Sequence, residues 1–97
     1  MRVLFWTKQA QADLAAVRAF VSQDSPHYAS VIIARLIAAT ERLVPFPESG
    51  RTVPEFANPL IREVVLRPYR IVYRLVGTDE IHILTVHHAS QRFPSEL

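Results

Sequence analysis

The chain has 97 residues, of which 49% are hydrophobic, and it contains no cysteine. This length predicts one domain spanning residues 1–97 around one core, and the apolar fraction excludes a disordered tail. The absence of cysteine excludes a disulfide framework and a thiolate metal site. Eleven Lys and Arg residues against nine Asp and Glu residues give a net charge of +2, which produces only a weak long-range field. Recognition of anions must therefore come from the local placement of arginine.

Several functional classes are excluded by missing signals. The N-terminus becomes polar after Trp6, too early for a signal peptide, and no apolar run approaches membrane-spanning length. Histidines and carboxylates do not occur at metal-ligand spacing, and there is no glycine-rich phosphate loop or nucleophilic serine motif. We therefore expect a cytoplasmic protein with no metal, no cofactor and no membrane partner.

The first half of the chain predicts a short strand followed by two helices. Residues 2–6 are an apolar strand, and Thr7 can cap a helix whose apolar positions recur at helical spacing as far as Val21. Ser25 followed by Pro26 is a strong helix start, because serine accepts a free amide hydrogen and proline lacks one. The second helix runs to about Leu43, and two amphipathic helices joined by a few residues form an antiparallel hairpin. We expect three aromatic residues of this half to be in the core, namely Trp6, Phe20 and Phe46.

The second half predicts an antiparallel meander after a proline-rich loop. The strands are residues 61–66, 69–76 and 80–88, with a bend near Gly50 and an irregular segment over residues 55–59. In the middle strand, alternation sends Tyr69, Ile71, Tyr73 and Leu75 to one face and Arg70, Val72, Arg74 and Val76 to the other. The predicted fold is α+β, with an N-terminal strand and a helical hairpin packed on one face of a small antiparallel sheet. The other face should present arginines that are free to bind anions or an acidic partner.

Arginine supplies ten of the eleven cations, and several arginines lie on or near these strands. The guanidinium stays protonated and makes planar, bidentate contacts to carboxylate or phosphate, so it is suited to fixed recognition. His87 and His88 end the last strand, and alternation allows only one of them to face the arginines. Glu55 and Glu63 could act as general bases, but a carboxylate beside Arg51 or Arg62 is more often part of a surface ion pair. His82 is interpreted as a solvated or hydrogen-bonded strand residue.

Short motifs occur in order over the second half of the chain, namely Gly50-Arg51, Val53-Pro54-Glu55, Ile61-Arg62-Glu63, the segment from Tyr69 to Arg74, and Val86-His87. Together with the N-terminal strand and the helical hairpin before them, they resemble the RelE/ParE superfamily of bacterial type II toxins over nearly the whole chain. The resemblance implies a small α/β toxin of a plasmid-stabilisation or stress module, encoded beside an antitoxin that covers it. Such an antitoxin is usually an acidic, partly disordered segment that folds on binding, so we expect a hetero-oligomer.

The superfamily contains two activities, and the resemblance favours the ParE-like one. ParE-like members poison DNA gyrase by binding it, whereas RelE-like members cleave mRNA on the ribosome. The lysine-rich strand of some RelE-like enzymes has no counterpart here, because Lys8 is the only lysine. The aromatic residue that many of them place after the last strand is at best Phe93, which has no hydroxyl. A third possibility is an inactive relic that only binds the antitoxin.

The candidate site residues differ between these activities. Under the nuclease alternative, with the ribosome and mRNA as partners, the catalytic residues are Arg62, Arg70 and His87, because RNA cleavage needs proton transfer and cations that stabilise the phosphorane. For binding of the target or the antitoxin, the candidates are Arg51, Arg62, Arg67, Arg70, Arg74, His88 and Arg92.

Overall fold

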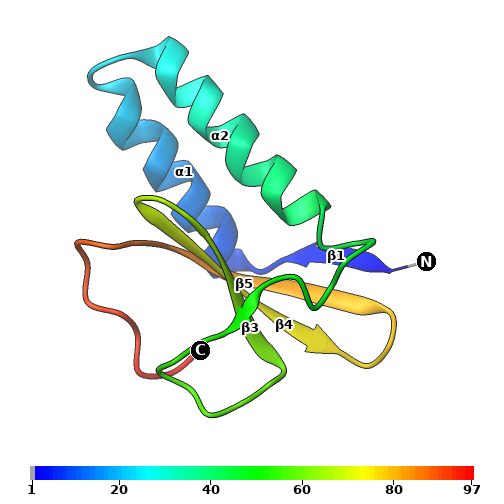
Figure 1. Ribbon diagram of the computed structural model, residues 1–97. Coiled ribbons are helices and arrows are strands. Elements are labelled where there is room, and N and C mark those ends of the chain that lie inside the picture. The colour runs from blue at the N-terminus through cyan, green and yellow to red at the C-terminus, as the bar shows by residue number, and fades with distance from the viewer. Residues whose placement is uncertain (1) are drawn as a thin grey trace.

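The computed structural model describes residues 2–97 and contains two helices and five strands (Figure 1). In chain order these are β1 (Val3–Trp6), α1 (Lys8–Ser22), α2 (Pro26–Glu41), β2 (Arg51–Thr52), β3 (Ile61–Leu66), β4 (Tyr69–Val76) and β5 (Glu80–His88). The predicted strands of the second half are confirmed at the predicted positions. No helix within residues 2–97 is long and apolar enough to cross a bilayer.

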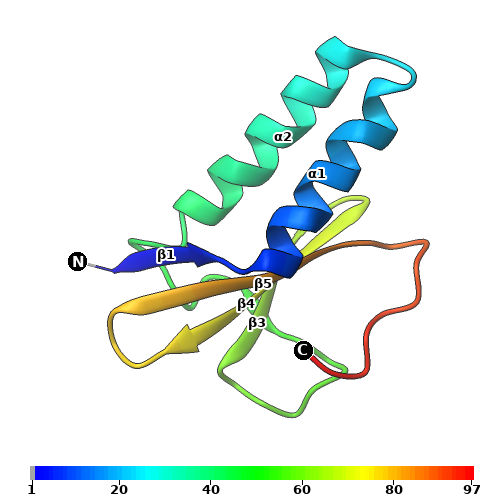
Figure 2. The ribbon, with the colours of Figure 1, turned by 180° about the vertical axis from the view of Figure 1, so that it is seen from behind.

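Both helices begin at the predicted side-chain caps. The side chain of Thr7 accepts a hydrogen bond from the amide of Ala10 at 3.1 Å, and Ser25 accepts one from the amide of Tyr28 at 3.1 Å. Pro26 occupies the first turn of α2, where its missing amide hydrogen costs nothing. The short connection between the helices therefore makes α1 and α2 antiparallel neighbours (Figure 2).

The sheet has the strand order β1-β5-β4-β3-β2, and only β1 is parallel to its neighbour. The other pairs are antiparallel, as expected for a meander. The N-terminal strand thus lies at the edge of the sheet beside β5, and α1 begins directly after it. Figures 1 and 2 show that α1 and α2 both cover the same face of the sheet. The predicted α+β fold is confirmed, with a mixed sheet.

The face covered by the helices, here called the helix face, holds the apolar core. Leu36 and Leu43 from the second helical segment pack with Ile71, Tyr73 and other residues of β4 and β5. The hydroxyl of Tyr73 donates to the carbonyl of Pro47 at 2.7 Å and accepts from the amide of Gly50 at 3.0 Å. This phenol therefore ties the loop before β2 to the centre of the sheet.

A β-bulge in β5 reverses its alternation halfway along the strand. Val72 pairs with Thr85 but Tyr73 pairs with Ile83, so Leu84 is an extra residue. Ile83 lies on the helix face before the bulge, and Val86 lies on it after the bulge, opposite Ile71. His87 therefore lies on the opposite face, here called the outer face, in register with Arg70.

Two of the three aromatic residues predicted for the core are exposed. Phe20 and Phe46 each keep 66% of their surface accessible, so this prediction was wrong for both. Phe20 lies in the last turn of α1, near the tip of the hairpin, and Phe46 lies in the loop after α2. Trp6 is partly buried and packs against the core.

Candidate functional site

Charged and titratable side chains lie together at one end of the outer face. Arg70 and His87 are in register across β4 and β5, and Glu63 lies on the same face of β3 because its register partner is Val72. Arg51 of β2 is in register with Glu63. Four strands thus bring an arginine pair, a carboxylate and an imidazole together.

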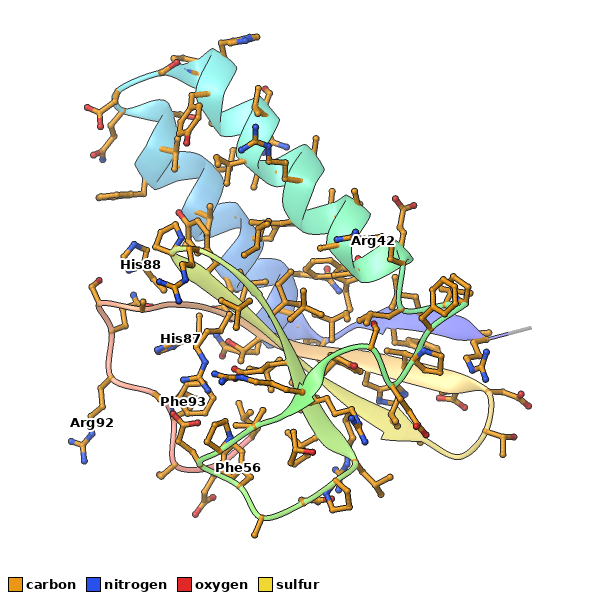
Figure 3. All side chains as sticks on the ribbon, in the orientation of Figure 1. Arg42, Phe56, His87, His88, Arg92 and Phe93 are labelled. Atoms are coloured by element: carbon orange, nitrogen blue, oxygen red, sulfur yellow. The ribbon has the colours of Figure 1, made fainter. Side chains whose placement is uncertain are left out.

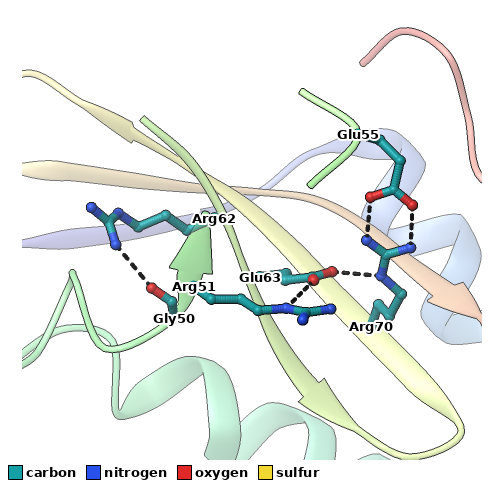
Figure 4. A network of polar contacts seen from close by, with 6 residues as sticks. All are labelled: Gly50, Arg51, Glu55, Arg62, Glu63 and Arg70. Atoms are coloured by element: carbon teal, nitrogen blue, oxygen red, sulfur yellow. Dashed lines mark hydrogen bonds and ion pairs between the residues drawn. The ribbon is translucent and has the colours of Figure 1, made fainter. Parts of the chain in front are cut away.

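Glu63 is the centre of this network, and its side chain is fully buried. Its carboxylate accepts a hydrogen bond from Nε of Arg51 at 2.6 Å and another from Nε of Arg70 at 2.5 Å (Figure 4). A buried carboxylate is stable only when it is paired and hydrogen-bonded, and the two guanidinium groups meet that requirement. The prediction that Glu63 is a surface ion-pair partner was therefore wrong in its placement, although right in the kind of partner.

Arg70 is engaged at all three guanidinium nitrogens. Beyond the bond from Nε to Glu63, its Nη1 and Nη2 donate to Glu55 at 2.9 and 2.8 Å in a bidentate pair. These bonds, Glu55 first and Glu63 second among the stabilising partners, raise the pKa of Arg70. The hydrogen bond that Glu55 accepts from Arg70 in turn lowers the pKa of Glu55 to about 2. The expectation of a freely available guanidinium at Arg70 was thus wrong, because the chain supplies its own anions.

The C-terminal segment closes over the same end of the outer face. The ring of Phe93 stacks on the guanidinium of Arg70, with 3.9 Å between the guanidinium carbon and the ring centroid. Phe93 also contacts Phe56 of the loop before β3, with 6.0 Å between ring centroids. Figure 1 shows the C-terminal segment returning beside this loop. Two segments that carry no strand or helix therefore meet over Arg70.

His87 is buried beneath this cover. Its Nε2 lies 2.9 Å from the carbonyl oxygen of Gln91, and since a carbonyl only accepts, Nε2 carries the hydrogen. The imidazole also meets the edge of Phe93, with ring centroids 5.0 Å apart. In this arrangement Nε2 is committed to holding the C-terminal segment.

The structure separates the other predicted site residues from this cluster. Arg62 is in register with Tyr73, on the helix face, and its guanidinium donates to the carbonyls of Gly50 and Pro59. His88 faces the same side, against the ring of Tyr69. Of the predicted set, the structure brings together Arg51, Arg70 and His87. It places elsewhere Arg62, Arg67, Arg74, His88 and Arg92.

Three of these separated residues are exposed cations. Arg67 lies in the turn between β3 and β4, and Arg74 lies at the far end of the outer face, in register with Ile61 and His82. Arg92 projects from the C-terminal segment away from the sheet (Figure 3). They are accessible to a partner without belonging to one site.

Sequence reasoning identified Glu55 as an exposed ion-pair partner, but it missed that Glu55, Phe56 and Phe93 complete the cluster around Arg70. Glu55 and Phe56 come from an irregular loop and Phe93 from the C-terminal segment, so no periodicity places them on the outer face. Glu63 did carry a signal, because it is the one carboxylate in β3 and lies on the face opposite the helices. Within residues 2–97, no group of histidine, aspartate and glutamate side chains could hold a metal ion.

A groove runs beside the network, along the edge of the sheet. It has a volume of about 570 Å³ and lies between α2 and β3. Exposed Phe46 and Val65 give it an apolar lining, and Arg42 and Arg51 add positive charge. β2 covers only Arg62 and Glu63 of the neighbouring strand, so the edge of β3 beyond them borders this groove.

Comparisons with known proteins agree on one family. The family described as the ParE toxin of the type II toxin–antitoxin system parDE matches residues 4–93. Toxin RelE2 of Caulobacter vibrioides is 34% identical over 91 residues, covering 94% of this chain and 99% of that protein. A solved structure of the chromosomal ParDE toxin–antitoxin system from P. aeruginosa has a chain that superposes with a TM-score of 0.74 at 27% identity. That match covers 91% of this chain and 96% of the other.

Proposed function

The chain belongs to the ParE toxin family of type II toxin–antitoxin systems, and from this premise we propose that it is a non-catalytic poison of DNA gyrase. As a toxin of such a system it has an antitoxin partner. The proposal concerns the target and the mode of action.

The observation that carries this proposal is the closed state of the Arg70 cluster. A nuclease needs a cation that is open to phosphate and a side chain that can transfer protons. Here each nitrogen of Arg70 already donates to a carboxylate, and Nε2 of His87 donates to a backbone carbonyl. Arg62, the third residue of the nuclease hypothesis, lies on the helix face. This arrangement supports recognition by surface contacts over cleavage of RNA.

One observation favours a second candidate, a RelE-like ribosome-dependent mRNA endonuclease. Arg70, His87 and Glu55 lie in one cluster, and a cation, an imidazole and a carboxylate are the groups that cleavage through the 2′-hydroxyl requires. The relative from Caulobacter vibrioides also carries the name RelE2. For this candidate to act, the loop carrying Glu55 and the segment carrying Phe93 must move away from Arg70.

The groove between α2 and β3 is the surface that we assign to the antitoxin. An acidic segment with apolar side chains suits a groove lined by Phe46 and Val65 and flanked by Arg42 and Arg51. Charge reversal at Arg42 should therefore weaken antitoxin binding, whereas the same change at Arg35, exposed on α2 and outside the groove lining, should not.

The deciding experiment compares the two targets directly. The purified protein is added to a DNA supercoiling assay with gyrase, and to a ribosome-containing translation reaction in which mRNA ends are mapped. We expect inhibited supercoiling with accumulated gyrase–DNA breaks, intact mRNA, and reversal of the inhibition by the antitoxin. Cut mRNA with unaffected gyrase would establish the second candidate, and no effect in either assay, with retained antitoxin binding, would indicate a relic.

A further inference from the structure

Two carboxylates bind Arg70, and they differ in their burial, in the element that carries them and in whether a second arginine shares them. Glu63 is on a central part of β3, its side chain is fully buried, and it is shared with Arg51. Glu55 is in the loop between β2 and β3, and its side chain is 41% exposed. The first carboxylate is part of the core of the fold, whereas the second can leave without unpairing a strand.

The guanidinium of Arg70 is oriented so that one edge faces this replaceable partner. Nε points to Glu63 and is fixed there, while Nη1 and Nη2 point together at Glu55 (Figure 4). Phe93 supports the plane of the group from below. A planar fork with both donors aligned and an aromatic support is the geometry that recognises a carboxylate. The chain therefore contains a formed carboxylate site that is filled by one of its own side chains.

We propose that Glu55 is an internal substitute for a partner's carboxylate, which replaces it on Arg70 when the toxin binds its target. The inference rests on the proposed function, in which the target is a protein. Glu55 then lowers the affinity for that target, since it competes for the same donors. Arg70 is the residue that receives the acidic side chain, and Glu63 is the residue that keeps Arg70 oriented while the exchange takes place.

Charge balance favours a carboxylate of a protein over a nucleic-acid strand. Arg51 and Arg70 are offset by Glu55 and Glu63, so departure of Glu55 leaves one net positive charge in this cluster. One carboxylate restores neutrality, whereas a strand adds a charge with every nucleotide. The surroundings also suit a protein, because Val65 is exposed and in register with Arg70, and Phe56 and Phe93 pack near Arg70. These contacts would accept the apolar neighbours of an acidic residue.

The size of the expected effect follows from the exposure of the pair. Exposed ion pairs change an equilibrium by a factor of about two to five, because solvent screens them. Removal of the internal competitor should therefore tighten target binding by about that factor. The gain should shrink at high salt, since both ion pairs are screened there.

The test measures binding of the full chain to the gyrase holoenzyme by calorimetry, for wild type and for Glu55→Gln. The matched control is Glu48→Gln, which removes one negative charge from an exposed position outside the network. We expect tighter binding, by about two- to fivefold, for Glu55→Gln and no change for Glu48→Gln. In an Arg70→Lys background the fork is lost but the charge is kept, so the Glu55→Gln gain should disappear.

The possible outcomes separate this proposal from the proposed function. If wild type binds gyrase and Glu55→Gln binds equally well or more weakly, the substitution idea is overturned while the gyrase function stands. If wild type does not bind gyrase, the proposed function fails, and the same comparison is made with the purified antitoxin. A gain there supports exchange of Glu55 for a partner's carboxylate, with the antitoxin and not the target as that partner, and its absence overturns the proposal. A gain seen only with a short single-stranded RNA oligonucleotide also overturns it, because the replacing anion is then a phosphodiester.

Discussion

The two faces of the sheet are buried by different chemistry, although the same central strands form both. On the helix face, side chains such as Leu36, Ile71 and Ile83 pack against α1 and α2 without charge. On the outer face, Glu63 is equally buried but is held by Arg51 and Arg70, under a loop and the C-terminal segment. Neighbouring residues of one strand, Ile71 and Arg70, therefore belong to two different kinds of interior.

The two kinds of burial differ in how readily one contact can be exchanged for another. Apolar packing is non-directional, and every void in it reduces the stability of the folded state. The helix face therefore has one well-defined arrangement. An ionic network is directional and can exchange one partner for another of equal charge. We therefore expect both buried sets of residues to stabilise the fold, and only the outer face to contain a group, Glu55, that a partner can replace.

The largest effect is expected on the helix face. Ile71→Ala removes a fully buried side chain from the core and leaves a cavity between the sheet and α2. The free energy of unfolding should fall by about 3–4 kcal/mol, measured by urea denaturation. Ile71→Val, which removes one methylene, should cost about 1 kcal/mol. Losses that depend on salt concentration would contradict the apolar character of this face.

Glu63→Gln should cost nearly as much, for a different reason. The amide keeps the shape of the side chain but leaves the guanidinium of Arg70 without its buried counter-ion, and Arg51 is 62% exposed and more tolerant. We expect a loss of about 3 kcal/mol in the free energy of unfolding, also by urea denaturation. An unchanged unfolding midpoint would show that the outer face does not depend on this network, and the contrast between the two faces would fail.

Gly50→Ala tests the segment that joins the two faces. A Cβ at this position would lie 2.6 Å from the carbonyl oxygen of Glu63 and 2.6 Å from the hydroxyl of Tyr73. Backbone of β3 must then shift, so we expect a loss of about 2 kcal/mol in the free energy of unfolding. Ser49→Ala, at the exposed neighbouring position, is the control and should stay within about 0.5 kcal/mol of wild type.

The helix face could be predicted from the sequence, because regular periodicity creates it. Helical spacing in residues 8–43 and alternation in β4 give the elements, the covered face and most of the core. Leu84 breaks this regularity, because alternation continued through it would have placed His87 on the helix face. The bulge forms where β1 ends and Thr7 bonds to the carbonyls of Ile83 and Leu84. The bulge therefore depends on tertiary contacts, and no local sequence pattern predicts it.

The outer face could be predicted only in part. Alternation along β4 placed Arg70 on the outer face. The partners of Arg70, however, come from segments without periodicity and lie up to 23 residues away in the sequence, as Phe93 does. Composition gives the number of arginines, whereas pairing is decided by which loops return over the sheet. This explains why a free cationic surface was predicted and a closed network was found.

The smallest expected effect concerns Glu55, and pH isolates it. The pKa of Glu55 falls from an ordinary value of 4.5 to about 2 in the folded protein, because Arg70 stabilises the carboxylate. The pair therefore stabilises the fold fully above about pH 4.5, and this contribution is lost as the pH falls through about 2. Since the Glu55 side chain is 41% exposed, solvent limits the contribution to less than about 1 kcal/mol. Glu55→Gln cannot titrate at this position and serves as the reference.

Urea denaturation of both proteins between pH 7 and pH 2 should give two curves that converge in acid. Wild type should be the more stable near neutral pH, and the difference should vanish near pH 2. Carboxylates elsewhere, including the core partner Glu63, are present in both proteins and cancel in the difference. A difference that persists at pH 2 would mean that Glu55 stabilises the loop through packing and not through Arg70. The exchange of carboxylates on the outer face would then have no ionic basis.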